Sequence, residues 1–438
     1  MGVFDNRPRT ADSPDVDDPH RYLNGVHVCQ PQGYTPGESV DGEIVVYFAD
    51  DPRKLYQLRQ WLPVFDLLDQ RHPVVIVMRN AEAYAALGGL TRLRALLVPT
   101  WPDLASVYET SDFRMVIYVN NSTYNFQSLG APAMAHVHVN HGESDKICMV
   151  SNKVKAYDRV FVAGEAAVRR HRAALVDFDE DKLVRVGRPQ LDLRPEPMLV
   201  PTDRPTILYA PTWEGENSSN DYTSVEVYGE TILAAALAVP GARVVYKPHP
   251  RVISSTTPAI VGAHERLVRM LDHVMEEDPN AGHRAELDSD ILAVIPSCDL
   301  MITDVSSVGL DFLYLRREQP VFITDRHSDR TQINTEVPIS RCADVIDATT
   351  IGDLTKMLIA RLAHDEHRTG RVEMRRYYFG DLAPGESTAR FLSAIDEILH
   401  TWNRLTGRTD PEHDEPRWAA TPPGSPRRPT MQPHGCPE

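Results

Sequence analysis

Short runs of aliphatic and β-branched residues alternate along the chain with segments of helical periodicity, and this alternation restricts the possible folds. Such runs are typical of strands that are buried on both faces of a sheet. Strands joined through helices predict right-handed crossovers and a mostly parallel sheet covered by helices on both sides. The expected strands form one series at 43–48, 73–78, 114–119, 136–139 and 159–162, and a second at 206–210, 243–247, 300–303 and 320–324.

Helical patterns lie between most of these strands. Pro63 should kink or split the first helix, because proline has no N–H to donate and clashes with the preceding turn. The last helix could either close the second series or cross back onto the first, and its apolar stripe consists of Phe391, Leu392, Ile395, Ile398 and Leu399. The expected helices are 54–70, 165–175, 228–239, 263–277, 308–316 and 386–405.

Segment 183–205 contains five prolines and separates the two series, so it is the expected hinge. The expected fold class is therefore α/β, with two Rossmann-like parallel-sheet domains that face a cleft. The first residues lack hydrophobic periodicity and predict a mobile arm, and the Pro-rich end predicts a disordered tail. The predicted boundaries are 1–40 for the arm, 41–195 and 196–405 for the two domains, and 406–438 for the tail.

Composition argues against several classes of protein. The 438 residues contain 46 Lys and Arg against 62 Asp and Glu, a formal net charge of −16. This balance argues against nucleic-acid binding, which needs a basic face. No stretch approaches the ~20 apolar residues that span a bilayer, and the N-terminus lacks the apolar core of a signal peptide. Five scattered cysteines without a CxxC pair favour a reducing compartment. The expected location is the cytoplasm.

Unusual polar residues follow the expected strands, at the edge where open α/β sheets bind ligands. After the fourth strand, His141 and Gly142 stand in a loop, with Lys146 shortly beyond. A histidine at a glycine turn near a lysine can be a general base, a phosphate contact or a solvated loop residue. His136 and His138 share one strand face and are expected to pack. No metal site is expected, because these histidines would need a further ligand.

Two strands of the second series end in similar blocks. In the run KPHP, prolines flank His249 and fix the backbone around it, which can direct an imidazole or simply make an exit turn. Strand 206–210 ends in Pro211 and Thr212, followed by Trp213, which places a hydroxyl and an aromatic ring at the same edge or anchors a loop.

The run TDVSS, residues 303–307, opens the helix expected after strand 300–303. Asp304, Ser306 and Ser307 are all good N-caps, so helix capping is one interpretation. The other is that backbone N–H groups and serine hydroxyls at this helix N-terminus hold a phosphate. Asp304 would repel a dianion and is expected to cap the helix or to orient a histidine.

Taken in order, these blocks resemble those of the CDP-glycerol glycerophosphotransferase family, whose enzymes build glycerol-phosphate and related teichoic-acid polymers. Asp311 also fits the family pattern, and the resemblance covers about Val137 to Asp325. The blocks HGxxxK, GxPxxD, YAPT, KxHP and TDxSS look like residues 141–146, 187–192, 209–212, 247–250 and 303–307. The chain departs from the pattern at Asn140, Glu143, Ser144, Val305 and Trp213.

The resemblance implies a GT-B fold, with the acceptor held by domain 41–195 and the nucleotide donor by domain 196–405. It implies transfer without metal or cofactor, in which an acceptor hydroxyl attacks the β-phosphorus of CDP-glycerol or a related CDP-activated polyol and CMP leaves. The acceptor would be a glycan or a lipid-linked polymer end. The resemblance implies that one histidine from each domain meets the other across the cleft, so the expected catalytic residues are His141, as general base, and His249, which would stabilise charge on the pyrophosphate. The expected donor contacts are Thr303, Asp304, Ser306, Ser307, Pro211 and Thr212, with Gly142, Lys146 and Asp311 as further candidates.

Two other readings stay open. Helix-N-terminal phosphate binding also serves GT-B glycosyltransferases and epimerases that use UDP-sugars. The changed residues around His141 are compatible with a catalytically idle nucleotide-binding scaffold. A peripheral contact with the inner face of the cell membrane is a further expectation, and the sequence leaves the oligomeric state open.

Overall fold

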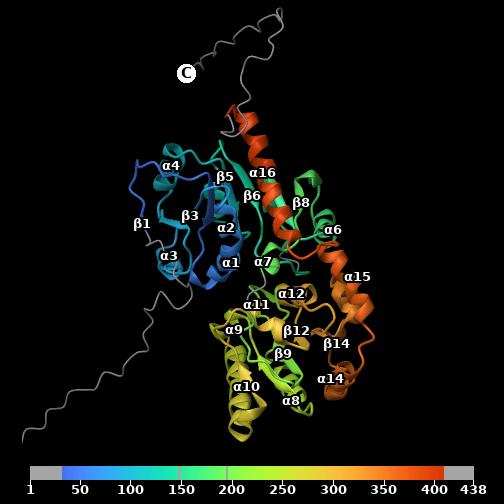
Figure 1. Ribbon diagram of the computed structural model, residues 1–438. Helices are drawn as coiled ribbons and strands as arrows, with labels where there is room; N and C mark the ends of the chain where they lie inside the picture. The colour runs from blue at the N-terminus through green and yellow to red at the C-terminus, as the bar shows by residue number, and fades with distance from the viewer. Residues whose placement is uncertain (1–31, 147–148, 194–195, 409–438) are drawn as a thin grey trace, which may run out of the picture.

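The computed structural model describes residues 32–146, 149–193 and 196–408, which form two α/β domains (Figure 1). Most of the expected arm and tail therefore lies outside the described residues.

Each domain is built on an all-parallel sheet, with the orders β1-β4-β3-β2-β5-β6-β7-β8 and β11-β10-β9-β12-β13-β14. The strands of the first sheet are β1 (Gln32–Gly33), β2 (Ile44–Phe48), β3 (Val74–Met78), β4 (Arg94–Leu97), β5 (Met115–Tyr118), β6 (Ala135–His138), β7 (Arg159–Val162) and β8 (Leu183–Arg185). Those of the second are β9 (Thr206–Ala210), β10 (Arg243–Tyr246), β11 (Arg284–Ala285), β12 (Leu300–Thr303), β13 (Val321–Thr324) and β14 (Asp344–Ile346).

Helices cover both sheets, and none in the described residues is long and apolar enough to cross a membrane. The first domain contains α1 (Leu55–Arg59), α2 (Leu62–Asp69), α3 (Ala81–Leu87), α4 (Trp101–Thr110), α5 (Asn125–Ser128), α6 (Glu165–Ala174) and α7 (Pro189–Asp192). After these come α8 (Gly229–Leu237), α9 (Pro250–Ile253), α10 (Pro258–Glu277), α11 (Ile291–Val294), α12 (Ser307–Leu315), α13 (Arg330–Glu336), α14 (Leu354–Ala363), α15 (Arg368–Phe379) and α16 (Glu386–Thr406).

The central strands are buried along their whole length, as the aliphatic runs predict. All five residues of β2, β3 and β9 are buried, because helices pack on both faces of each sheet. Each of the nine expected strands is confirmed to within one residue at either end. Pro63 lies in the first turn of α2 and separates it from α1, so the expected split of the first helix is confirmed.

The hinge prediction was wrong at its beginning. Residues Leu183–Arg185 form β8, which pairs with β7 and extends the first sheet, because its Leu183 is buried against the core beside Val160. The short strands β1, β4, β11 and β14 were also not predicted. Three of these four lie at sheet edges, where few residues pair and the apolar signal is weak.

Helix α16 crosses back onto the first domain, the second of the two courses that the sequence left open (Figure 1). Its Phe391 ring packs against Trp61 and Phe161, with centroids 5.3 and 5.7 Å away. The chain therefore passes between the domains twice, and the two passages lie side by side. The hydroxyl of Ser387 donates to the carbonyl of Val186 (2.8 Å), which ties one passage to the other.

Candidate active site

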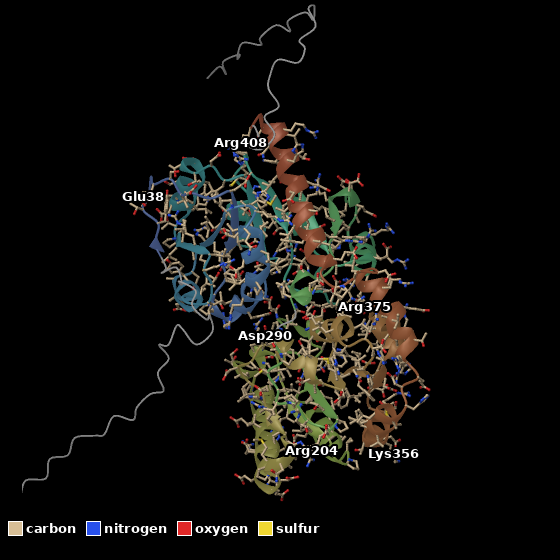
Figure 2. The ribbon with its side chains drawn as sticks, viewed as in Figure 1. Glu38, Arg204, Asp290, Lys356, Arg375 and Arg408 are labelled. Carbon is tan, nitrogen blue, oxygen red and sulfur yellow. The ribbon has the colours of Figure 1, made fainter. Side chains whose placement is uncertain are left out.

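A cavity of about 590 Å³ lies between the two domains, at the carboxyl ends of β6, β9, β10 and β12. Figure 2 shows Asp290, one of its lining residues, at the boundary between the domains, and Arg204 at the far end of the second domain. Open α/β sheets bind ligands at this edge. The structure brings most of the predicted site residues to the cavity wall, namely His141, Gly142, Lys146, Pro211, Thr212, His249, Ser306, Ser307 and Asp311.

His141 enters the cavity from a tight turn after β6. Asn140 adopts a left-handed backbone conformation (φ 54°), and its side-chain oxygen accepts the N–H of His141 at 2.8 Å. The Trp61 indole donates to the Asn140 carbonyl at 2.6 Å and fixes the turn to α2. Burial, with the charges of Arg188, Lys54 and Lys146, lowers the pKa of His141 to about 4. The imidazole is therefore neutral at pH 7.

His249 enters from the second domain, at the start of α9. Its Nδ1 accepts the backbone N–H of Arg251 at 3.1 Å, so the neutral ring carries its proton on Nε2 and can donate there. Burial lowers its pKa well below the ordinary value, and the charges of Lys146 and Arg251 add to this shift. The two predicted histidines thus differ in their surroundings: the Nδ1 of His249 is occupied by a main-chain donor, whereas that of His141 has no hydrogen-bond partner among the described residues.

Tyr56, on α1, joins the two histidines. Its ring lies edge-on to His141 and to His249, with centroid separations of 6.0 and 5.5 Å and interplanar angles of 90° and 88°. Sequence reasoning missed this residue, because nothing in the pattern of α1 distinguishes a cavity tyrosine from an ordinary surface one.

The N-terminus of α12 forms the floor of the site. Ser306 holds the N-cap position, yet its hydroxyl makes no capping hydrogen bond within the described structure and lies 3.3 Å from the Thr303 hydroxyl. Capping by the Ser306 side chain, one of the two interpretations, is therefore not observed. Gly142 of the first domain meets this helix start, since a Cβ added there would lie 3.2 Å from the Cβ of Ser307.

Thr303 and Asp304 lie beneath the cavity floor and are fully buried. The Thr303 hydroxyl donates to the carbonyl of Ala210 at 2.7 Å. The carboxylate of Asp304 accepts the backbone N–H of Thr212 at 2.7 Å and the hydroxyl of Thr324, so it joins the ends of three neighbouring strands. Burial raises the pKa of Asp304 to about 6. These contacts position the floor, and they differ from the expected roles of Asp304, because within the described structure its carboxylate accepts from Thr212 and Thr324 and not from a histidine or the first N–H groups of α12.

Two polar contacts join the domains across the site. Lys146 donates to the hydroxyl of Thr212 at 2.9 Å. Arg188 donates to the carboxylate of Asp311 at 2.8 Å and to the carbonyl of His141 at 2.9 Å. Arg188 stands inside the GxPxxD block, but its variable place in that block gave no signal of this contact.

The neighbouring histidines are structural, as expected. The His136 ring lies 2.9 Å from the Tyr118 hydroxyl and 2.8 Å from the Ala131 carbonyl, and His138 stacks on Tyr157. Among the residues that the structure describes, no group of three or more His, Cys, Asp or Glu could hold a metal ion.

Comparison with known proteins identifies the fold and the family. No curated protein matches the chain significantly. The wall teichoic acid polymerase TagF shares 12% identity at a TM-score of 0.53, over 82% of this chain and 90% of TagF. A putative UDP-N-acetylglucosamine 2-epimerase from Listeria monocytogenes shares 15% identity at a TM-score of 0.53, over 82% and 97%. Both likenesses confirm the expected GT-B fold.

The profile of the CDP-glycerol:poly(glycerophosphate) glycerophosphotransferase family matches residues 107–397, about two thirds of the sequence. The chain therefore belongs to this family of transferases.

Proposed function

We propose that the protein transfers glycerol phosphate, or a related polyol phosphate, from a CDP-activated donor to a hydroxyl of a glycan or lipid-linked polymer, and releases CMP. One observation carries this proposal: His141 and His249, from opposite domains, converge on Tyr56 inside an interdomain cavity. A phosphorus atom between the two imidazoles would have a proton acceptor on one side and a proton donor on the other.

His141 is the proposed general base. Burial and neighbouring cations hold its pKa at about 4, which keeps the ring unprotonated but weakly basic before a donor binds. An anionic diphosphate would offset the cationic field of Arg188 and Lys146, and the pKa of His141 would rise toward neutrality when the donor binds. The base would thus become effective in the presence of its substrate.

The donor phosphates are proposed to lie against the start of α12, which has nine residues. Its free N–H groups, the hydroxyls of Ser306 and Ser307 and the Nε2–H of His249 would stabilise negative charge there. Gly142, Pro211 and Thr212 would shape the wall. Thr303 and Asp304 would support it from below, and Lys146 and Asp311 would hold the domains together.

The acceptor is proposed to occupy the first-domain side of the cavity. The amide and hydroxyl side chains of Gln57, Asn120, Asn121 and Ser122 line that side, together with the cations Lys54 and Arg59. The amides and hydroxyls suit hydrogen bonds to the hydroxyls of a polyol or sugar. We propose that the reaction takes place in the cytoplasm, at the inner face of the membrane if the acceptor is lipid-linked.

A ligand panel tests the donor. Thermal unfolding is measured with CDP-glycerol, CDP-ribitol, CMP, UDP-glucose and UDP-N-acetylglucosamine, for the wild type and for Ser306→Ala. We expect selective stabilisation by the CDP compounds, about 2.7 kcal/mol at a hundred times Kd, and a weaker response in the variant. A preference for UDP compounds would favour the glycosyltransferase or epimerase reading. Binding of CDP-glycerol without CMP release over a range of acceptors would favour the idle scaffold.

A further inference from the structure

Arg251 and Trp213 form a feature of the cavity that the roles above leave unused. The central carbon of the Arg251 guanidinium lies 3.4 Å from the centroid of the Trp213 ring, which is close stacking distance. Both residues line the interdomain cavity. Trp213 follows the end of β9 and Arg251 lies in α9, so two adjacent strands of the second sheet bring them together.

Stacking on the indole leaves the guanidinium edge available. An arginine carries five N–H donors in the plane of the group, and a ring against its face uses none of them. The ion pair that the structure gives Arg251 is with Glu216, at 3.8 Å, and the Glu216 side chain is 69% exposed. A pair this long and this exposed is weak. The edge of Arg251 can therefore exchange Glu216 for a stronger anion.

The position of Arg251 is fixed relative to His249. Its backbone N–H donates to His249 Nδ1, and the Trp213 ring lies 6.3 Å from the His249 ring. Lys146 and Lys247 also line the cavity, and their charges, with that of Arg251, add to the effect of burial in lowering the pKa of His249. Cations thus gather around one imidazole, although Asp288 and Asp290 line the cavity as well and the chain as a whole is acidic.

We propose that Arg251, held flat on Trp213, binds the transferred β-phosphate of the nucleoside diphosphate donor. This inference rests on the proposed function, in which the reacting phosphorus lies between His141 and His249. Because the guanidinium stacks on Trp213, whose ring lies 6.3 Å from that of His249, it lies at the His249 end of the cavity, where it can reach the same phosphate and form two parallel N–H···O bonds. Trp213 acts as a positioning residue that keeps the planar group in this orientation.

The test compares CDP with CMP, which differ by the β-phosphate. Affinities are measured by calorimetry for the wild type, Arg251→Gln, Arg251→Lys, Trp213→Phe and Trp213→Leu. The matched control is Arg266→Gln on α10, which removes the same charge from an exposed pair with Glu230 of α8. Melting curves without ligand verify that each variant is folded.

We expect Arg251→Gln to weaken CDP binding about 10- to 100-fold, as for loss of a charged hydrogen-bonding partner, and to leave CMP binding close to wild type. Arg251→Lys should be intermediate, Trp213→Phe close to wild type and Trp213→Leu weaker for CDP alone. Equal losses for CDP and CMP, or no loss, would overturn the assignment. If Arg251→Gln does not fold, Arg251→Lys and Trp213→Leu decide in the same way. A wild type that binds neither nucleotide would instead contradict the proposed function itself.

Discussion

Arg188 and Asp311 form an ion pair of 2.8 Å across the interdomain boundary, and both side chains are about 95% buried or more. Removal of one partner would leave the other charge buried without compensation. We expect Arg188→Ala to lower the free energy of unfolding by about 3–5 kcal/mol, and Arg188→Met with Asp311→Leu to recover much of the loss. Denaturant titration measures both. The exposed pair Arg390–Glu386 is the control, and its loss should cost under about 0.5 kcal/mol. Equal costs at the two pairs would contradict this account.

His141→Gln should separate catalysis from donor binding. The substitution keeps a polar side chain of similar size but removes the proton acceptor. We expect kcat for CMP release to fall about 10²- to 10⁴-fold, while the Kd for CDP changes little. Stopped assays with a polyol acceptor and calorimetry with CDP give the two quantities. A variant with wild-type kcat would exclude His141 as the base.

The free energy of unfolding should decrease as the pH falls, because His141 takes up a proton more readily in the unfolded state. Its pKa is about 4 in the folded chain against an ordinary 6.5, so the folded state binds this proton less readily than the unfolded state. The contribution of His141 to the free energy of unfolding is complete above pH 6.5 and is lost as the pH falls toward 4. We expect this group to contribute about 2 kcal/mol of the loss between pH 7.5 and 5. His141→Gln should reduce the loss of stability between pH 7.5 and 5 by that amount, whereas His273→Gln, on the exposed face of α10, should not.

Catalysis should depend on the aromatic ring of Tyr56 and not on its hydroxyl. Tyr56→Phe keeps the edge-on contacts with both imidazoles, and we expect kcat within about twofold of wild type, since removal of a hydroxyl bonded to Gln57 costs little. Tyr56→Ala removes the surface on which both rings rest, and kcat should fall about tenfold or more because misplaced groups react slowly. The pH profile of kcat should shift in Tyr56→Ala alone. Similar losses in both variants would assign the effect to the hydroxyl.

A side chain at Gly142 should reduce activity. An added Cβ would lie 3.2 Å from the Cβ of Ser307 and would push the His141 loop away from the start of α12. We expect Gly142→Ala to reduce kcat/KM for the donor about tenfold, on the scale of a misplaced catalytic group. Gly352→Ala is the control, because a Cβ at that position meets no atom within 4 Å. An unchanged kcat/KM would mean that the loop and helix yield without cost.

Much of the fold was predictable, because the central strands are continuous aliphatic runs that follow from burial on both faces. Strand β8 could not be predicted from an aliphatic run, because one of its three residues is an exposed arginine. Its position depends instead on pairing with β7. The course of α16 was undecided for a related reason: an apolar stripe shows that a helix is buried but not which surface buries it.

The site was predictable where its residues follow strand ends. His141, His249 and Ser306 converge because parallel strands place their carboxyl ends at one edge of each sheet, and the two edges face one another. Tyr56 and Arg188 were missed because their importance arises from contacts between elements far apart in sequence. Arg251 is adjacent to a predicted block, yet its stacking on Trp213 depends on two loops that the sequence does not relate.

The return of α16 to the first domain also affects biosynthesis. Trp61 and Phe161 are part of a core that Phe391 completes, so a nascent chain that has finished the first sheet still lacks its last apolar cover. That apolar surface stays uncovered while the whole second domain is synthesised, which takes about 10–40 s at ordinary rates of translation. The second domain can fold on the ribosome before the first is finished, and a truncation ahead of α16 should leave a chain that chaperones retain.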